Sequence, residues 1–252
     1  MRRFILPGAD LSGDTVEVRG DLFRHMAKVL RLKIDTRVQL ADGRGCECTG
    51  IIREIGRESL RVAITRRRAA APFNAAPRIT LYQGVPKGDK MELILQKCTE
   101  LGVTEVVPFQ AARSVSRIAG EREAAKIRRW QRVAEEASRQ AGRGVVPAVR
   151  FAPGMGAVAD EADHDLRLLL WEEERLTGLR DLLTATPLPE SIAVIVGPEG
   201  GIAPEEADLA RRGGFVPVTL GRRILRTETA GIAIVAILQY LFGDLGSAGP
   251  TT

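Results

Sequence analysis

Residues 193–201 read AVIVGPEGG, a short apolar run that ends in a loop of glycine, proline and glutamate. An apolar run of this length, closed by Gly and Pro, predicts a buried strand followed by a tight turn. Glycine loops after strands often bind phosphates, but this one has neither the lysine of a P-loop nor the Gly-x-Gly-x-x-Gly spacing of a dinucleotide site. Its glycines would let the backbone approach a flat ligand closely, although a purely structural turn is an alternative.

Strand and helix patterns alternate around this loop, which predicts an α/β domain with a mainly parallel sheet. Asp89 and Glu92 form a capping-box pattern at the start of one helix, and Gly102 follows its end. A second helix begins at Pro204, and a third, residues 228–242, is apolar almost all round and must be buried against the sheet or a second subunit. The predicted strands span residues 79–85, 103–109, 166–171, 192–196 and 215–220.

The first 65 residues show a different pattern, with short β-rich segments separated by turns. One helix, residues 21–31, interrupts them and places Leu22, Met26, Val29 and Leu30 on an apolar face. His25 is expected to be a partly buried helix residue and not a catalyst. Arg24, Lys28 and Arg31 lie on its other face, so a small β-barrel with a basic helix suits a nucleic-acid-binding module. The β-rich segments span residues 3–6, 15–18, 38–41, 46–55 and 60–64.

Charge is distributed unevenly along the 252 residues, whose net charge is +5. The first 150 residues hold 29 of the 37 Lys and Arg side chains, whereas the remainder is acidic. This asymmetry predicts a polyanionic partner for the first part of the chain, the alternative being a solvated basic surface without a partner.

Cysteine and histidine are too few and too scattered to suggest a metal site. Cys46 and Cys48 lack the spacing and the second ligand pair of a zinc site, so reduced thiols are the better interpretation. No apolar run approaches the roughly 20 residues that span a bilayer, and no secretory signal follows the first methionine. We therefore expect a cytoplasmic protein with no bound metal and no membrane contact.

Chemistry is expected at the carboxyl ends of the parallel strands, where open α/β sheets bind their ligands. These ends are Leu170, the glycine loop, and the segment LGRRILRTETA (residues 220–230), in which Thr227 resembles a helix N-cap. Arg222, Arg223 and Arg226 crowd this third segment within an acidic half of the chain, which indicates a negatively charged partner.

Four motifs resemble one known family: RHMAKVLRLK (24–33), KGDKMELILQKCTELG (87–102), VGPEGG (196–201) and LGRRILRTETA (220–230). In this order and spacing they are similar to the 16S ribosomal RNA uracil N3-methyltransferases of the SPOUT superfamily. The resemblance implies a PUA-like β-barrel RNA-binding domain (1–70), a linker (71–78) and a SPOUT-type methyltransferase domain (79–252). That second domain is expected to be a knotted (trefoil), mainly parallel α/β fold that acts as a homodimer on the 16S rRNA of the small ribosomal subunit.

The resemblance also implies S-adenosylmethionine as methyl donor, held by the three loops. Arg222 departs from the pattern, which favours proline after Leu-Gly, and puts the shape of that loop in question. The implied cofactor residues are Leu170, Gly197, Pro198, Glu199, Gly200, Leu220, Gly221, Ile224 and Leu225.

Residue types constrain the reaction further. Methylation of uracil carbon 5 generally needs a cysteine nucleophile, and none of the three loops contains one, so a ring nitrogen or a ribose oxygen fits better. At N3 a proton must leave while negative charge develops on the flanking carbonyl oxygens, where Arg226 would stabilise it. Glu228 and Glu199 are candidate proton acceptors, although either could instead cap a helix or order a loop, and Arg226 could bind an RNA phosphate.

RNA contacts are expected through phosphate and shape recognition, since aromatic content is only 4%. Two other classes of function stay open: a ribosome-assembly factor that binds RNA without a methyl donor, and a nucleotide-utilising enzyme. The second is disfavoured by the missing phosphate-loop signatures. The RNA contacts are assigned to Arg24, Lys28, Arg31, Lys87, Lys90, Arg113 and Arg139.

Overall fold

The structure is a computed structural model that describes residues 2–6, 9–42, 46–69, 77–118, 120–174 and 177–246. Internal contacts divide the chain into two compact units, Met1–Asn74 with Ser138–Val146, and Ala75–Ala137 with Pro147–Thr252. Most of the predicted linker, residues 71–76, lies outside the described residues, and Arg78 already begins a strand.

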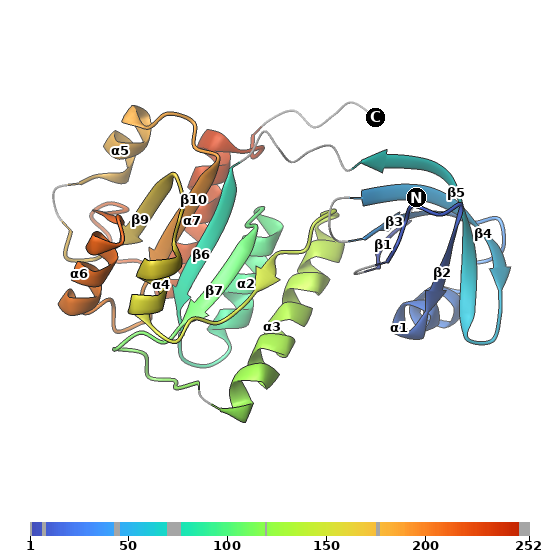
Figure 1. Ribbon diagram of the computed structural model, residues 1–252, viewed down its shortest axis with the longest axis horizontal. Coiled ribbons are helices and arrows are strands. Elements are labelled where there is room, and N and C mark those ends of the chain that lie inside the picture. Colours follow the sequence, from blue (N-terminus) through green and yellow to red (C-terminus); the bar gives the residue numbers. More distant parts are fainter. Residues whose placement is uncertain are drawn as a thin grey trace. The chain divides into compact units, whose positions relative to one another are not determined.

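The first unit contains a curled five-stranded sheet in the order β1-β3-β4-β5-β2, drawn in blue shades in Figure 1. The β1–β3 pair is parallel and the other pairs are antiparallel, which confirms the predicted β-rich module. Alternate residues such as Val38, Leu40 and Val62 are fully buried and form its core. Its strands are β1 (Arg2–Ile5), β2 (Thr15–Arg19), β3 (Arg37–Ala41), β4 (Cys46–Ile55) and β5 (Ser59–Ala69).

The basic helix of this unit differs from the predicted regular α-helix. It consists of α1 (Gly20–Phe23) followed by a π-helical segment, η1 (Arg24–Val29), in which the Leu30 amide bonds to the His25 carbonyl. Because a π turn contains more residues than an α turn, the side chain of Val29 is rotated away from the core, whereas Ala27 and Leu30 stay packed against it. Met26 is fully buried but Val29 is 67% exposed, and His25 is exposed too, so both predictions of burial were wrong.

The second unit is built on a six-stranded sheet in the order β11-β9-β10-β6-β7-β8, in which every pair is parallel. This confirms the predicted α/β domain. The strands lie side by side in the α/β part of Figure 1. They are β6 (Arg78–Gly84), β7 (Glu105–Phe109), β8 (Ala148–Val149), β9 (Leu166–Leu170), β10 (Ser191–Val196) and β11 (Val216–Val218).

Helices cover both faces of this sheet. Tyr82 belongs to the same core as Val158 and Ala207, whereas the neighbouring Leu81 approaches Gly231 on the opposite face. On that opposite face α2 packs against α7. The helices are α2 (Lys90–Glu100), α3 (Glu121–Gln140), α4 (Met155–Glu161), α5 (Leu179–Ala185), α6 (Pro204–Arg212) and α7 (Thr227–Phe242). Within the described ranges, no helix is both long and apolar enough to cross a membrane.

Helix ends agree with the sequence signals in part. Gly102 follows α2 with a φ of 99°, a conformation that favours glycine, and α6 begins at Pro204 as predicted. The predicted capping box of α2 was wrong, because Asp89 makes no side-chain cap. Glu92 instead forms an ion pair at 2.6 Å with Arg129 of α3, so its carboxylate contacts a neighbouring helix and not the start of its own.

Candidate functional site

The three predicted loops begin side by side at the carboxyl edge of the parallel sheet. Leu170 at the end of β9 pairs with Val196 of β10 on one side and with Val218 of β11 on the other. The loops that follow these strands therefore leave the sheet as neighbours, which is where α/β sheets bind ligands.

The glycine loop packs directly on the end of β6. A Cβ atom at Gly84 would lie 2.5 Å from Pro198 Cδ and 2.7 Å from its nitrogen, so glycine is needed for this approach. No side chain can fit between these two backbone segments. The position of the glycine loop is therefore fixed from behind by β6.

A buried amide joins the glycine loop to the start of α7. Gln83 is fully buried, and its Nε2 donates to Thr227 Oγ1 at 2.9 Å and to the Gly197 carbonyl at 3.3 Å. Thr227 Oγ1 in turn donates to the same carbonyl at 2.5 Å. The predicted N-cap role of Thr227 was wrong, because Arg226 occupies the N-cap position and the hydroxyl bonds outside its own helix. Gln83 was missed, although an amide at the end of a buried strand was a visible signal.

Glu199 is held by the loop between β6 and α2. Its carboxylate accepts from Lys90 Nζ at 2.7 Å and from the backbone amide of Lys87 at 3.2 Å to each oxygen. Burial alone would raise the pKa of Glu199, but the hydrogen bonds from Lys90 and from backbone amides outweigh it and lower the pKa. The hydrogen bond to Glu199 raises the pKa of Lys90. Glu199 is therefore anionic, and its hydrogen-bonding capacity is largely used.

Glu228, in the first turn of α7, lies on the other side of the same lysine. Its Oε2 is 3.6 Å from Lys90 Nζ, is buried, and has no hydrogen-bond partner among the described residues. The structure thus brings together two predicted catalytic residues, Glu199 and Glu228, around a lysine that was predicted as an RNA contact.

A loop after β7 covers the glycine loop from another side. Arg113 Nη1 donates to the Gly200 carbonyl at 3.3 Å, and a Cβ at Gly200 would lie 2.9 Å from Arg113 Cβ. The buried carboxylate of Glu206 accepts from the amides of Ala112 and Ala203, at 2.9 and 3.2 Å. These contacts, which the sequence did not indicate, order both loops.

The end of β9 reaches the glycine loop through two side chains. Trp171 Nε1 donates to the Ile202 carbonyl at 3.3 Å. The Glu172 carboxylate occupies the place that a side chain at Gly201 would take, with Oε1 1.8 Å from an added Cβ. Gly201 has a φ of 72°, so its backbone also favours glycine.

The third loop is open to solvent. Gly221 has a φ of 120° with no atom within 4 Å of an added Cβ, and Ile224 is 92% exposed. The side chains of Arg222, Arg223 and Arg226 are exposed and form no ion pair with any described residue. This loop therefore offers open space, an apolar side chain and unpaired positive charge beside the glycine loop.

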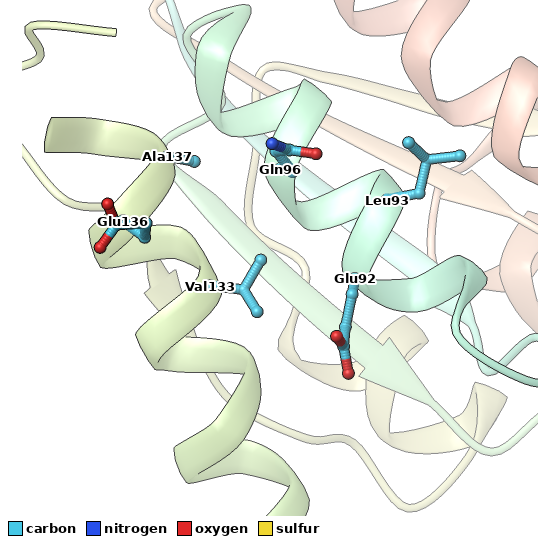
Figure 2. A pocket seen from close by; sticks show the side chains of 6 residues that line it. All are labelled: Glu92, Leu93, Gln96, Val133, Glu136 and Ala137. Atoms are coloured by element: carbon cyan, nitrogen blue, oxygen red, sulfur yellow. The ribbon is translucent and has the colours of Figure 1, made fainter. Parts of the chain in front are cut away.

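A groove of about 360 Å³ lies apart from these loops, between α2 and α3 (Figure 2). Leu93, Val133 and Ala137 supply its apolar surface, and Glu92, Gln96 and Glu136 its polar one. None of the three loops contributes to it. Across the described ranges, no three His, Cys, Asp or Glu side chains gather as a metal site.

The predicted RNA contacts differ in whether their charged side chains already pair with a carboxylate. Lys28 and Arg31 are exposed in the first unit, whereas Arg24 pairs with Asp21 at 2.5 Å. Arg139 is exposed at the end of α3.

Comparison with known proteins identifies the class. Residues 74–239 match the family model of the RNA methyltransferase domain, and residues 18–65 match that of the RNA methyltransferase PUA domain. Together with the parallel sheet and its converging loops, these matches define an RNA methyltransferase of the SPOUT type.

Individual relatives define the family more closely. The chain is 33% identical over 234 residues to ribosomal RNA small subunit methyltransferase E of Mycobacterium bovis, covering 91% of this chain and 88% of that one. It is 28% identical to the Bacillus subtilis protein of the same name, covering 90% of each. The crystal structure of the Neisseria gonorrhoeae protein of that name, bound to S-adenosyl methionine, superposes with a TM-score of 0.84 at 34% identity, covering 97% and 99% of the two chains. The chain belongs to the ribosomal RNA small subunit methyltransferase E family.

Proposed function

We propose that this chain transfers a methyl group from S-adenosylmethionine to N3 of a uridine in the 16S rRNA of the small ribosomal subunit. The observation that carries the proposal is the convergence of three loops at one sheet edge, joined by the hydrogen bond between Thr227 and Gly197. The relatives' name supports ribosomal RNA as substrate, and the Neisseria structure supports the donor.

The geometry fits such a donor. The empty space in front of Gly221 and the exposed Ile224 provide a surface for a flat base, and the glycines permit close backbone approach. When bound, S-adenosylmethionine supplies an electrophilic methyl group. The proposed donor-binding residues are Leu170, Gly197, Pro198, Glu199, Gly200, Leu220, Gly221, Ile224 and Leu225.

Arg226 is proposed to stabilise the uracil anion that forms as N3 loses its proton. Its guanidinium is exposed beside the glycine loop and forms no ion pair with a described residue, so it is available to an anionic group. Of the two acceptors, Glu228 is favoured over Glu199. The Glu199 carboxylate already accepts three hydrogen bonds and its pKa is lowered, whereas Glu228 retains unused acceptor capacity.

The remaining expectations follow from the same family. We propose a PUA-like RNA-binding domain over residues 1–70, a linker over 71–78 and a methyltransferase domain over 79–252 with a trefoil knot. The exposed apolar side chains of Ile237, Tyr240 and Leu241 on α7 support a homodimer through this helix. An rRNA substrate, as the relatives' name gives, supports a cytoplasmic site of action.

The test is transfer of a labelled methyl group to naked 16S rRNA and to assembled small subunits, followed by mapping of the modified base. The proposal expects label at uridine N3 in at least one substrate. Label on ribose, on another base or on transfer RNA would contradict it. Calorimetric titration with S-adenosylmethionine separates an enzyme from a ribosome-assembly factor, because the latter should show no binding heat.

A further inference from the structure

One lysine connects three separate segments of the candidate site. Lys90 begins α2, directly after the loop that leaves β6, and its ammonium lies 2.7 Å from Glu199 and 3.6 Å from Glu228. Glu199 belongs to the glycine loop and Glu228 to the first turn of α7. The two carboxylates therefore share one cation.

We propose that Lys90 is a positioning residue that holds the glycine loop against the start of α7, and not an RNA phosphate contact. The inference rests on the proposed function, since it takes these two segments as walls of the donor site. It adds a second connection to the one already made by Thr227 and Gly197.

Electrostatics explain why a cation is needed at this point. The Oε2 atom of Glu228 is buried and accepts no hydrogen bond from a described residue, so Lys90 is the charge that offsets it. Both carboxylates lie within 4 Å of the same ammonium, and its removal would leave two neighbouring anions without compensation. Repulsion between the two carboxylates would then oppose the contact between the glycine loop and the start of α7, and this wall of the donor site would lose part of its support.

Lys87 offers a matched control three residues away. Only its backbone amide contacts Glu199, and its exposed side chain forms no ion pair with a described residue. The two lysines are three residues apart but differ in their contacts, because only the side chain of Lys90 pairs with a carboxylate. We therefore assign the RNA phosphate contact to Lys87 and the positioning role to Lys90.

The experiment compares the single variants Lys90→Met, Lys90→Arg, Glu199→Gln and Lys87→Met with the double variant that combines Lys90→Met and Glu199→Gln. Affinity for S-adenosylmethionine is measured by calorimetry, and RNA affinity by filter binding over a range of salt. We expect Lys90→Met to weaken donor binding roughly three- to tenfold, Lys90→Arg to restore most of it, and the double variant to lose no more than the single one. Lys87→Met should leave donor affinity unchanged and lower the salt slope of RNA binding by about 0.7–0.9.

Two results would overturn the inference: a reduced salt slope in Lys90→Met with unchanged donor affinity, or losses in Lys90→Met and Glu199→Gln that simply add. A wild-type protein that binds the donor but methylates no RNA would contradict only the proposed function. If the wild type binds no donor, the same double-mutant cycle in urea unfolding decides whether Lys90 and Glu199 are coupled, and absence of coupling overturns the inference.

Discussion

The hydroxyl of Thr227 donates a 2.5 Å hydrogen bond to the carbonyl oxygen of Gly197 and so joins the first turn of α7 to the glycine loop. The same hydroxyl accepts from the buried Gln83, so its one donor proton and one of its lone pairs are engaged inside the protein. A side chain of the same shape without the hydroxyl should therefore show how much this hydrogen bond contributes to the free energy of unfolding.

Thr227→Val should lower the free energy of unfolding by about 1–3 kcal/mol, because Gln83 Nε2 and the Gly197 carbonyl lose a buried partner. Urea denaturation measures this change, and calorimetry should show weaker binding of S-adenosylmethionine. Thr227→Ser keeps the hydroxyl and serves as control. A loss of stability in Thr227→Ser but not in Thr227→Val would show that the methyl group, and not the hydrogen bond, matters.

Arg226→Ala should lower kcat about 10²- to 10³-fold, as expected when a donor to a developing anion is removed. Affinity for S-adenosylmethionine should change little, because the proposed partner of Arg226 is the uracil. Single-turnover methyl transfer and calorimetry on the same preparation give the two numbers. Parallel losses in turnover and donor affinity would contradict the anion-stabilising role.

Gly201→Ala should weaken donor binding, because the new methyl group would displace the Glu172 carboxylate from the glycine loop. Gly20→Ala is a matched control in the first unit, since Gly20 has a φ of 65° against 72° for Gly201 but no atom near an added Cβ. Both variants should lose about 1–2 kcal/mol of stability from backbone strain. Only Gly201→Ala should change the calorimetric affinity, and an unchanged value would show that the loop absorbs the methyl group.

His164 should make stability depend on pH between neutral and mildly acidic conditions. It is half-buried with Nε2 3.0 Å from Thr80 Oγ1, and burial, followed by the nearby Arg78 and Arg167, keeps its pKa below the ordinary value despite opposing carboxylates. A histidine with a lowered folded pKa binds more protons when unfolded, so the free energy of unfolding falls as pH drops below about 6.5. Urea midpoints measured between pH 7.5 and 5 should show this fall.

The variant His164→Asn should flatten that dependence, while His25→Asn, at an exposed position, should leave it as in the wild type. A pH dependence that persists in His164→Asn would place its origin in other groups.

RNA binding should weaken steeply with salt and should depend unequally on the basic residues of the first unit. Each phosphate contact contributes about 0.7–0.9 to the slope of log affinity against log salt. Lys28→Ala and Arg31→Ala should each lower the slope by about that amount, whereas Arg24→Ala should have less effect because Asp21 already pairs with Arg24. Filter binding at several salt concentrations measures the slopes. A nearly flat dependence in the wild type would contradict phosphate-dominated binding.

Regular strands and apolar stripes were predictable because their residues repeat with the period of the element. The strand over residues 46–55 has the predicted bounds, and Met26 of the predicted apolar face is fully buried. Where prediction failed, a local signal competed with a distant partner. Glu92 pairs with Arg129 instead of capping its helix, and the Thr227 hydroxyl bonds to Gly197 instead of its own first turn.

The candidate site could be located from sequence, but its internal contacts could not. The three loops were identifiable because glycine and arginine cluster after apolar strands. The sharing of Lys90 by Glu199 and Glu228 joins segments more than 100 residues apart, and no spacing rule reports such a contact. Likewise, the π-helical segment that exposes Val29 has no distinct residue pattern.

The contact between Gly84 and Pro198 has a consequence for how this family can diversify. Because the proline ring fills the place of any side chain at position 84, a larger residue there is admissible only if the glycine loop moves as well. A larger side chain at position 84 therefore requires a change in the glycine loop, whereas Pro198 can be replaced while Gly84 is kept. Position 224 in the third loop carries no such constraint, because the side chain of Ile224 is 92% exposed.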